Sequence, residues 1–294
     1  MAAKSTRNRK RDRNDAEVFC KSAKKPSLNN TRNELLNTRN EILFYGDSLT
    51  FGMHHRRADR YRVTWPQLME DNLHSEGYRI VESALCSRTT VYDDPWERND
   101  DWMPGSEASD FNGLSHFGAL FSSHTPKILV LALGTNDLKT RIRRQAKTAA
   151  QRLVPWLTGR QTPLDEARAI AESCARIGEK ARVLHSGFCH NNDQELKIIV
   201  VTPPHLVLND TSEEMGYDKL SEDISREFSQ AFEEMCRDHG FIHVAKTPPA
   251  MDGSSDGVHF TKQAQIELSQ MVWKDLESII RESKPVTRAR IRSQ

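Results

Sequence analysis

Residues 128–133 form an unbroken apolar run, Ile-Leu-Val-Leu-Ala-Leu. A strand that is apolar at every position must be covered on both faces, which is typical of the central strand of a parallel sheet. Four shorter runs of strand-like residues lie elsewhere in the chain, at 42–45, 78–81, 198–201 and 241–245. The sequence therefore predicts a parallel sheet of about five strands.

Helical patterns lie between several of these runs. Apolar residues recur at helical spacing over 65–73, 164–174, 220–235 and 268–279. Because strands and helices alternate, we expect a doubly wound three-layer α/β/α sandwich. Residues 92–126 and 142–162 show no clear period, and we expect them to be irregular.

The formal net charge of +1 is unevenly distributed along the 294 residues. Residues 1–40 carry +7 and residues 281–294 carry +4, so the remaining body, 41–280, carries −10. The first 40 residues also have few apolar side chains, which predicts a disordered basic tail. We expect one domain at 41–280 between two basic tails, and its acidic body argues against a surface that binds nucleic acid.

The chain shows no signal for secretion or for a membrane. Its five cysteines are scattered without a CxxC pair, which fits a reducing compartment and predicts a cytoplasmic protein. The basic run at residues 7–13 leaves three interpretations open: a solvated tail, a nuclear localisation signal or a weak polyanion-binding arm.

Polar clusters follow several of the predicted strands. They lie at 46–50, 84–89, 134–137 and 256–259. In open parallel sheets, ligands bind beyond the carboxyl ends of the strands, so we expect these clusters to converge on one crevice.

The side chains in these clusters suit acyl transfer. A serine such as Ser48 needs a base to take its proton, and His259 is a candidate base. Asp256 lies three residues earlier and can turn back to orient the imidazole. The amide of Asn136 and backbone N–H groups of Ser48 and of a residue near Ser87 would then bind the oxyanion.

At these residues the chain resembles the SGNH (GDSL-type) hydrolases. The matching blocks are Gly46-Asp47-Ser48-Leu49, Gly134-Thr135-Asn136-Asp137 and Asp256-Gly257-Val258-His259. The resemblance is greatest to the arylesterase/acyltransferase (perhydrolase-like) branch. It implies a flavodoxin-like fold with Ser48 as nucleophile, His259 as base and acid, and Asp256 as the orienting carboxylate.

The chain departs from the family pattern at two places. The second block usually supplies a glycine, and the resemblance puts Ser87 at that position as a backbone donor beside Ser48 and Asn136. Phe51 and Met53 stand where the branch often has aromatic residues, at the edge of the acyl pocket. Two further candidates for the pocket are Asp47, beside the nucleophile, and His205, after the fourth strand.

Three functions remain open from the sequence. The first is a hydrolase or acyltransferase of short-chain acyl esters, and the second is a carbohydrate O-acetyl esterase with Trp96 and Trp102 as sugar-stacking faces. The third is an inactive scaffold that binds polyanions through its basic tails.

We expect neither a cofactor nor a metal. There is no GxSxG elbow, GxGxxG motif or P-loop. The side chains of the adjacent pairs His54-His55 and Asp93-Asp94 would diverge on a strand. Residues 142–162 look inserted, as a lid or as a contact of a homo-oligomer.

Overall fold

A computed structural model describes residues 40–55, 59–95, 106–153, 161–188, 195–251 and 253–283. Several sequence predictions lie outside this part of the chain: those on the basic tails before residue 40 and after residue 283, and those on Cys20, Trp96, Trp102 and Cys189. The last helix, α11 (Lys262–Ser283), continues past the predicted end of the domain at residue 280.

The described residues contain one parallel sheet of five strands, in the order β2-β1-β3-β4-β5. This is the strand order of the flavodoxin-like sandwich, so the predicted fold class is confirmed. Each predicted run forms a strand: β1 (Glu41–Gly46), β2 (Arg79–Ala84), β3 (Ile128–Ala132), β4 (Lys197–Val201) and β5 (Ile242–Val244).

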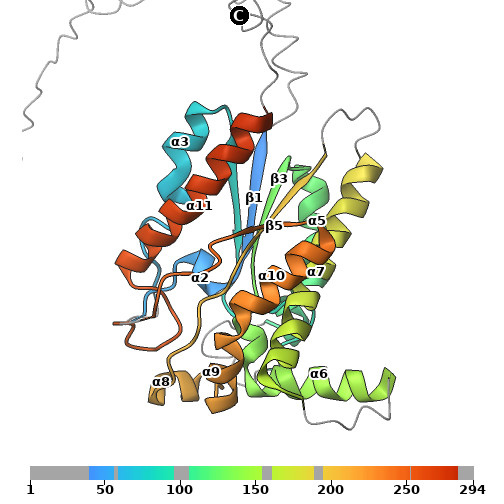
Figure 1. Cartoon of the computed structure of the whole chain (residues 1–294), viewed down its shortest axis with the longest axis vertical. Helices are drawn as coiled ribbons and strands as arrows, with labels where there is room; N and C mark the ends of the chain where they lie inside the picture. Colours follow the sequence, from blue (N-terminus) through green and yellow to red (C-terminus); the bar gives the residue numbers. More distant parts are fainter. Residues whose placement is uncertain are drawn as a thin grey trace, which may run out of the picture. The chain divides into compact units, whose positions relative to one another are not determined.

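Helices cover both faces of the sheet (Figure 1). Alternate residues of β1 point to opposite faces of the sheet. Leu43 and Tyr45 pack into one core cluster, and Ile42 and Phe44 pack into the other. The first cluster lies under α5 (Gly113–His124), α7 (Pro163–Phe188), α9 (Lys219–Arg226) and α10 (Phe228–His239). The second lies under η1 (Gln67–Met69), α3 (Glu70–Ser75) and α11.

In their described parts, the two stretches predicted to be irregular are largely helical, so that prediction was wrong. Helix α5 and the short η2 (Ala108–Phe111) lie within 92–126, and α6 (Thr140–Leu153) runs into 142–162. Phe117 and Phe121 of α5 are fully buried in the first core cluster. Helix α6 is rich in Arg, Lys, Gln and Ala, which favour helix by propensity without marking an apolar face.

One predicted helical pattern is divided in two. The apolar residues over 220–235 are shared by α9 and α10, which meet at Glu227. None of the helices in the described ranges is both long and apolar enough to cross a membrane.

Candidate active site

Ser48 lies immediately beyond the carboxyl end of β1, as the first residue of the short helix α2 (Ser48–Phe51). Asp47 caps this helix, and its Oδ1 accepts a hydrogen bond of 2.9 Å from the Leu49 N–H. A Cβ atom on Gly46 would lie 2.1 Å from Thr50 Oγ1, so the turn before the serine needs a glycine. Glycine and aspartate thus fix the backbone that presents Ser48.

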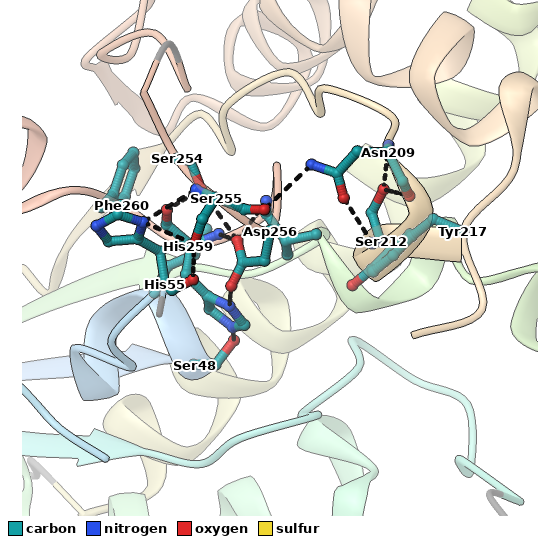
Figure 2. Close-up of polar contacts among 12 residues, drawn as sticks. Ser48, His55, Asn209, Ser212, Tyr217, Ser254, Ser255, Asp256, His259 and Phe260 are labelled. Atoms are coloured by element: carbon teal, nitrogen blue, oxygen red, sulfur yellow. Dashed lines mark hydrogen bonds and ion pairs between the residues drawn. The ribbon is translucent and has the colours of Figure 1, made fainter. Parts of the chain in front are cut away.

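A chain of hydrogen bonds joins Ser48, His259 and Asp256 (Figure 2). His259 Nε2 lies 2.9 Å from Ser48 Oγ, and His259 Nδ1 lies 2.8 Å from Asp256 Oδ2. Burial raises the pKa of Asp256, but hydrogen bonds and the charge of His259 outweigh burial and lower that pKa to about 2. The ionised carboxylate accepts a hydrogen bond from Nδ1–H, which leaves the Nε2 lone pair to accept a hydrogen bond from the Ser48 hydroxyl.

The loop that carries Asp256 and His259 is held from several sides (Figure 2). Within the loop, Ser254 Oγ donates to the His259 carbonyl at 2.8 Å. From outside, the Ser255 N–H donates to His55 Nδ1 at 3.0 Å, and Asn209 Nδ2 donates to the Ser255 carbonyl at 3.4 Å. These contacts fix the loop against the segment after α2 and the segment before α8 (Asp210–Glu214).

Asn136 and Ser87 lie beyond the carboxyl ends of β3 and β2. The Asn136 Nδ2 donates to the Arg88 carbonyl at 3.1 Å, and the Tyr217 hydroxyl donates to Asn136 Oδ1 at 3.4 Å. Both bonds orient the amide. Ser87 has φ +63°, a left-handed backbone that glycine adopts more easily than serine does.

The segments after β2 and β3 are also tied together. Asp137 Oδ2 accepts from the Thr90 N–H at 3.0 Å, and Asp137 Oδ1 accepts from Thr90 Oγ1 at 2.6 Å. Burial raises the pKa of Asp137 to about 7 against these hydrogen bonds. Because Asp137 follows Asn136 directly, the contact sets the distance between the two loops.

A cavity of about 130 Å³ lies in front of Ser48, and we call it the Ser48 cavity. Its lining residues are Ser48, Met53, Cys86, Ser87, Asn136, Lys139, Met215, Tyr217, Val258 and His259. The structure therefore brings five sequence candidates to one cavity: Ser48, Met53, Ser87, Asn136 and His259.

Three further pocket candidates, Asp47, Phe51 and His205, are not among the residues that line this cavity. Asp47 is buried, and its carboxylate caps α2. The ring of Phe51 lies under the Arg60 guanidinium, whose Cζ is 4.8 Å from the ring centroid. His205, after β4, is half-buried, whereas its neighbour Leu206 is fully buried and donates its N–H to Ser225 Oγ at 2.9 Å.

Five lining residues were not among the sequence candidates: Cys86, Lys139, Met215, Tyr217 and Val258. Lys139 had a usable signal, because it lies three residues after Asn136 in the same polar segment. Met215 and Tyr217 lie beyond α8, far from any motif, and no pattern marks them.

The adjacent pairs weighed as metal ligands have other contacts. The rings of His54 and His55 stack with an interplanar angle of 10° instead of diverging, and Asp94 pairs with Lys139. The described residues contain no cluster of three or more His, Cys, Asp or Glu side chains fit to hold a metal ion.

Comparison with known proteins agrees with this architecture. The model of the GDSL-like lipase/acylhydrolase family matches residues 44–265. No curated protein matches the chain significantly.

Solved esterase structures share the fold. Est24, a carbohydrate acetylesterase from Sinorhizobium meliloti, is 22% identical with a TM-score of 0.64 over 82% of this chain and 100% of its own. The aryl esterase of M. smegmatis is 23% identical with a TM-score of 0.62 over 81% of this chain and 99% of its own. Since the family model matches most of the chain, including the cavity and the segments that carry Ser48, Asn136 and His259, this chain belongs to the GDSL-like lipase/acylhydrolase family.

Proposed function

We propose that this chain is a serine esterase that hydrolyses short-chain acyl esters through an acyl-serine intermediate, with alcohols as competing acceptors. The observation that carries the proposal is the hydrogen-bonded chain from Ser48 Oγ through His259 to Asp256 at the wall of a cavity. Such a chain makes a serine hydroxyl nucleophilic by giving its proton a destination.

The first half of the reaction forms the acyl-serine. His259 Nε2 takes the Ser48 proton while Oγ attacks the ester carbonyl carbon. The oxyanion is stabilised by Asn136 Nδ2 and by the N–H groups of Ser48 and Ser87, which line the same cavity. The imidazolium, stabilised by Asp256, then gives its proton to the alkoxide leaving group as the C–O bond breaks.

The second half repeats these proton transfers with a new nucleophile. His259 Nε2 takes a proton from water, whose oxygen attacks the acyl carbon, and returns a proton to Ser48 Oγ as the acid leaves. An alcohol that reaches the acyl carbon first yields a new ester instead. Hydrolysis and transfer therefore use the same residues and differ in the acceptor.

The size of the cavity supports a short acyl group. Its volume of about 130 Å³ is below the ~300–1,000 Å³ of typical ligand pockets. Met53, Met215 and Val258 give it an apolar wall. We therefore expect kcat/KM to fall as the acyl chain lengthens.

The test is a panel of p-nitrophenyl esters of increasing acyl length, each assayed with water alone and with an added alcohol. Wild type is expected to prefer the shortest esters, and Ser48→Ala to lower kcat/KM by ~10⁴–10⁶. A loss below about tenfold in Ser48→Ala would remove Ser48 from the mechanism.

A second candidate function is a carbohydrate O-acetyl esterase. The shared fold with Est24, described as a carbohydrate acetylesterase, favours this substrate class. Acetylated sugars and aryl acetates would be compared on the same enzyme preparation. A higher kcat/KM for the sugars would favour this function, and turnover of aryl acetates alone would exclude it.

A further inference from the structure

Lys139 is a lysine almost fully buried in the wall of the Ser48 cavity, and the mechanism above gives it no role. Its side chain is only 4% exposed. It lies directly after η3 (Asn136–Leu138), and its backbone N–H donates to the Asn136 carbonyl at 3.2 Å. Lys139 is thus fixed to the segment that supplies one oxyanion donor.

The ammonium of Lys139 reaches across to the other oxyanion segment. Its Nζ lies 3.3 Å from Ser87 Oγ and 3.2 Å from Asp94 Oδ2. Burying an ammonium costs several kcal/mol unless it is paired with an opposite charge. The ion pair with Asp94 offsets this cost for Lys139. Arg141 also binds Asp94, with its Nη2 2.8 Å from Oδ2, so the carboxylate keeps a partner without Lys139.

Ser87 needs such a contact because of its backbone. It occupies the third position of the turn that the Arg88 N–H closes on the Leu85 carbonyl, with φ +63°. A non-glycine residue in this left-handed region is strained and persists where its surroundings hold it. In the described structure, the Lys139 ammonium is a buried group that holds the Ser87 side chain.

We infer that Lys139 is a positioning residue of the oxyanion hole: paired with Asp94, it donates to Ser87 Oγ and holds the Ser87 peptide in the orientation that binds the oxyanion. One residue thereby couples the two loops that carry Ser87 and Asn136. The inference rests on the proposed esterase function and adds a role that the acyl transfer steps do not need by themselves.

Protonation of Lys139 gives this role a pH signature. Asp94, Arg141 and Asp47 are the charged groups that act on the ammonium, and the titratable His259, Cys86 and Tyr217 line the same cavity. Burial, only partly opposed by Asp94, lowers the pKa of Lys139 to about 8. The neutral amine carries no charge to pair with Asp94, so we expect kcat to fall as pH rises through about 8.

The test is a double-mutant cycle between Lys139→Met and Ser87→Ala, with kcat and KM measured on a short aryl ester. Alone, Lys139→Met should lower kcat by ~10–100-fold with little change in KM, because a displaced donor costs less than the ~10²–10³ of a deleted one. In the Ser87→Ala background, which lacks the Oγ, Lys139→Met should lower kcat by less than about threefold. The decline of kcat above pH 8 should be absent from both single variants.

Lys147→Met is the matched control. Like Lys139, Lys147 shares its carboxylate partner with an arginine, because Lys147 and Arg143 both bind Glu166. Unlike Lys139, Lys147 does not line the Ser48 cavity. We expect its kcat and pH profile to match wild type.

The outcomes separate this inference from the proposed function. The role of Lys139 would be overturned if Lys139→Met kept the wild-type kcat and pH profile, or if it lowered kcat equally in the wild-type and Ser87→Ala backgrounds. The proposed function would still stand in either case if turnover depended on Ser48. Wild type without Ser48-dependent turnover would overturn both. If Lys139→Met fails to fold, Ser87→Ala decides alone: a retained decline above pH 8 would contradict the inference, and its loss would support it.

Discussion

Two cavities of similar size lie beside η3, and only one of them has the arrangement of a catalytic site. Asn136 lines the Ser48 cavity, whereas its neighbour Asp137 lines a second cavity of about 110 Å³. We call the second one the Glu166 cavity, because Glu166 lines it together with Arg143 and Lys147. Each cavity thus has a basic wall supported by a buried carboxylate.

The difference lies in the path that a proton can follow. In the Ser48 cavity, the hydroxyl, imidazole and carboxylate of Ser48, His259 and Asp256 are hydrogen-bonded in sequence. In the Glu166 cavity, the hydroxyl of Ser173 donates instead to the Ala169 carbonyl of its own helix at 2.8 Å. Size and charge are therefore shared, and we expect reactivity to belong to the first cavity alone.

Among the changes that compare the two cavities, the largest effect is expected for Asp256→Asn. An asparagine amide in place of the carboxylate can donate to Nδ1 and favour the tautomer that carries its proton on Nε2, so Ser48 loses its base. We expect kcat to fall by ~10⁴ on a short aryl ester. Glu166→Gln makes the same change in the other cavity and should alter kcat by less than about threefold; comparable losses in both variants would erase the contrast.

Next is Asn136→Ala, which removes an amide donor from the Ser48 cavity. We expect kcat to fall by ~10²–10³ with KM nearly unchanged, because the donor acts on charge that develops in the transition state. Steady-state kinetics of this variant against Asp137→Asn checks the point. An unchanged kcat in Asn136→Ala would place the oxyanion elsewhere.

Asp137→Asn should act on stability more than on rate. Burial raises the pKa of Asp137 from 3.8 to about 7, so the folded state holds a proton that the unfolded chain releases. Its contribution to stability is present in full below pH 3.8 and is lost as pH rises through about 7.

Urea unfolding at pH 5 and pH 7.5 measures this effect. The free energy of unfolding should decrease from pH 5 to pH 7.5 in wild type. In Asp137→Asn that decrease should be smaller by about 1 kcal/mol or more. Asp47, whose pKa burial raises to about 6, contributes in the same direction to both proteins, and its charge is also one of the causes that raise the pKa of Asp137. An identical pH dependence in the two proteins would contradict the assignment.

The smallest effect is expected for Lys147→Met in the Glu166 cavity. The Lys147 side chain is 44% exposed, and ion pairs at such positions contribute ~0–1 kcal/mol. Thermal unfolding should therefore detect at most a small change. A large loss of stability would show that the Glu166 cavity is more tightly coupled to the fold than its exposure suggests.

The sequence predicted those parts of the molecule whose residue types have few alternatives. Strands buried on both faces, such as β3, are apolar throughout, and the residues that follow them were expected to share a crevice. Helices α5 and α6 were missed because Ser, His and Gly interrupt the first and charged residues fill the second. In α5, Leu114, Phe117 and Phe121 still recur at helical spacing and pack in the core, so that helix had a usable signal. Helix α6 is favoured mainly by the helix propensity of its residues.

The same limit applies to the site. Ser48 and Asn136 were found because each lies in a motif at a strand end, and His259 because its motif lies just before the last helix. Sequence position does not give the direction of a side chain, so Phe51 and His205 were expected in a cavity that they do not line. Lys139 and Tyr217 enter it through the packing of η3 and the segment after α8. The roles of the basic tails, cellular location and oligomeric state remain predictions.

The most direct test of the proposed function is covalent labelling of the purified full-length chain with a short alkyl fluorophosphonate, read by intact mass and peptide mapping. We predict one adduct per chain, on Ser48, with loss of ester hydrolysis in proportion to labelling and no adduct on Ser48→Ala. Full labelling of another residue, or unchanged hydrolysis after Ser48 is fully labelled, would contradict Ser48 as the nucleophile.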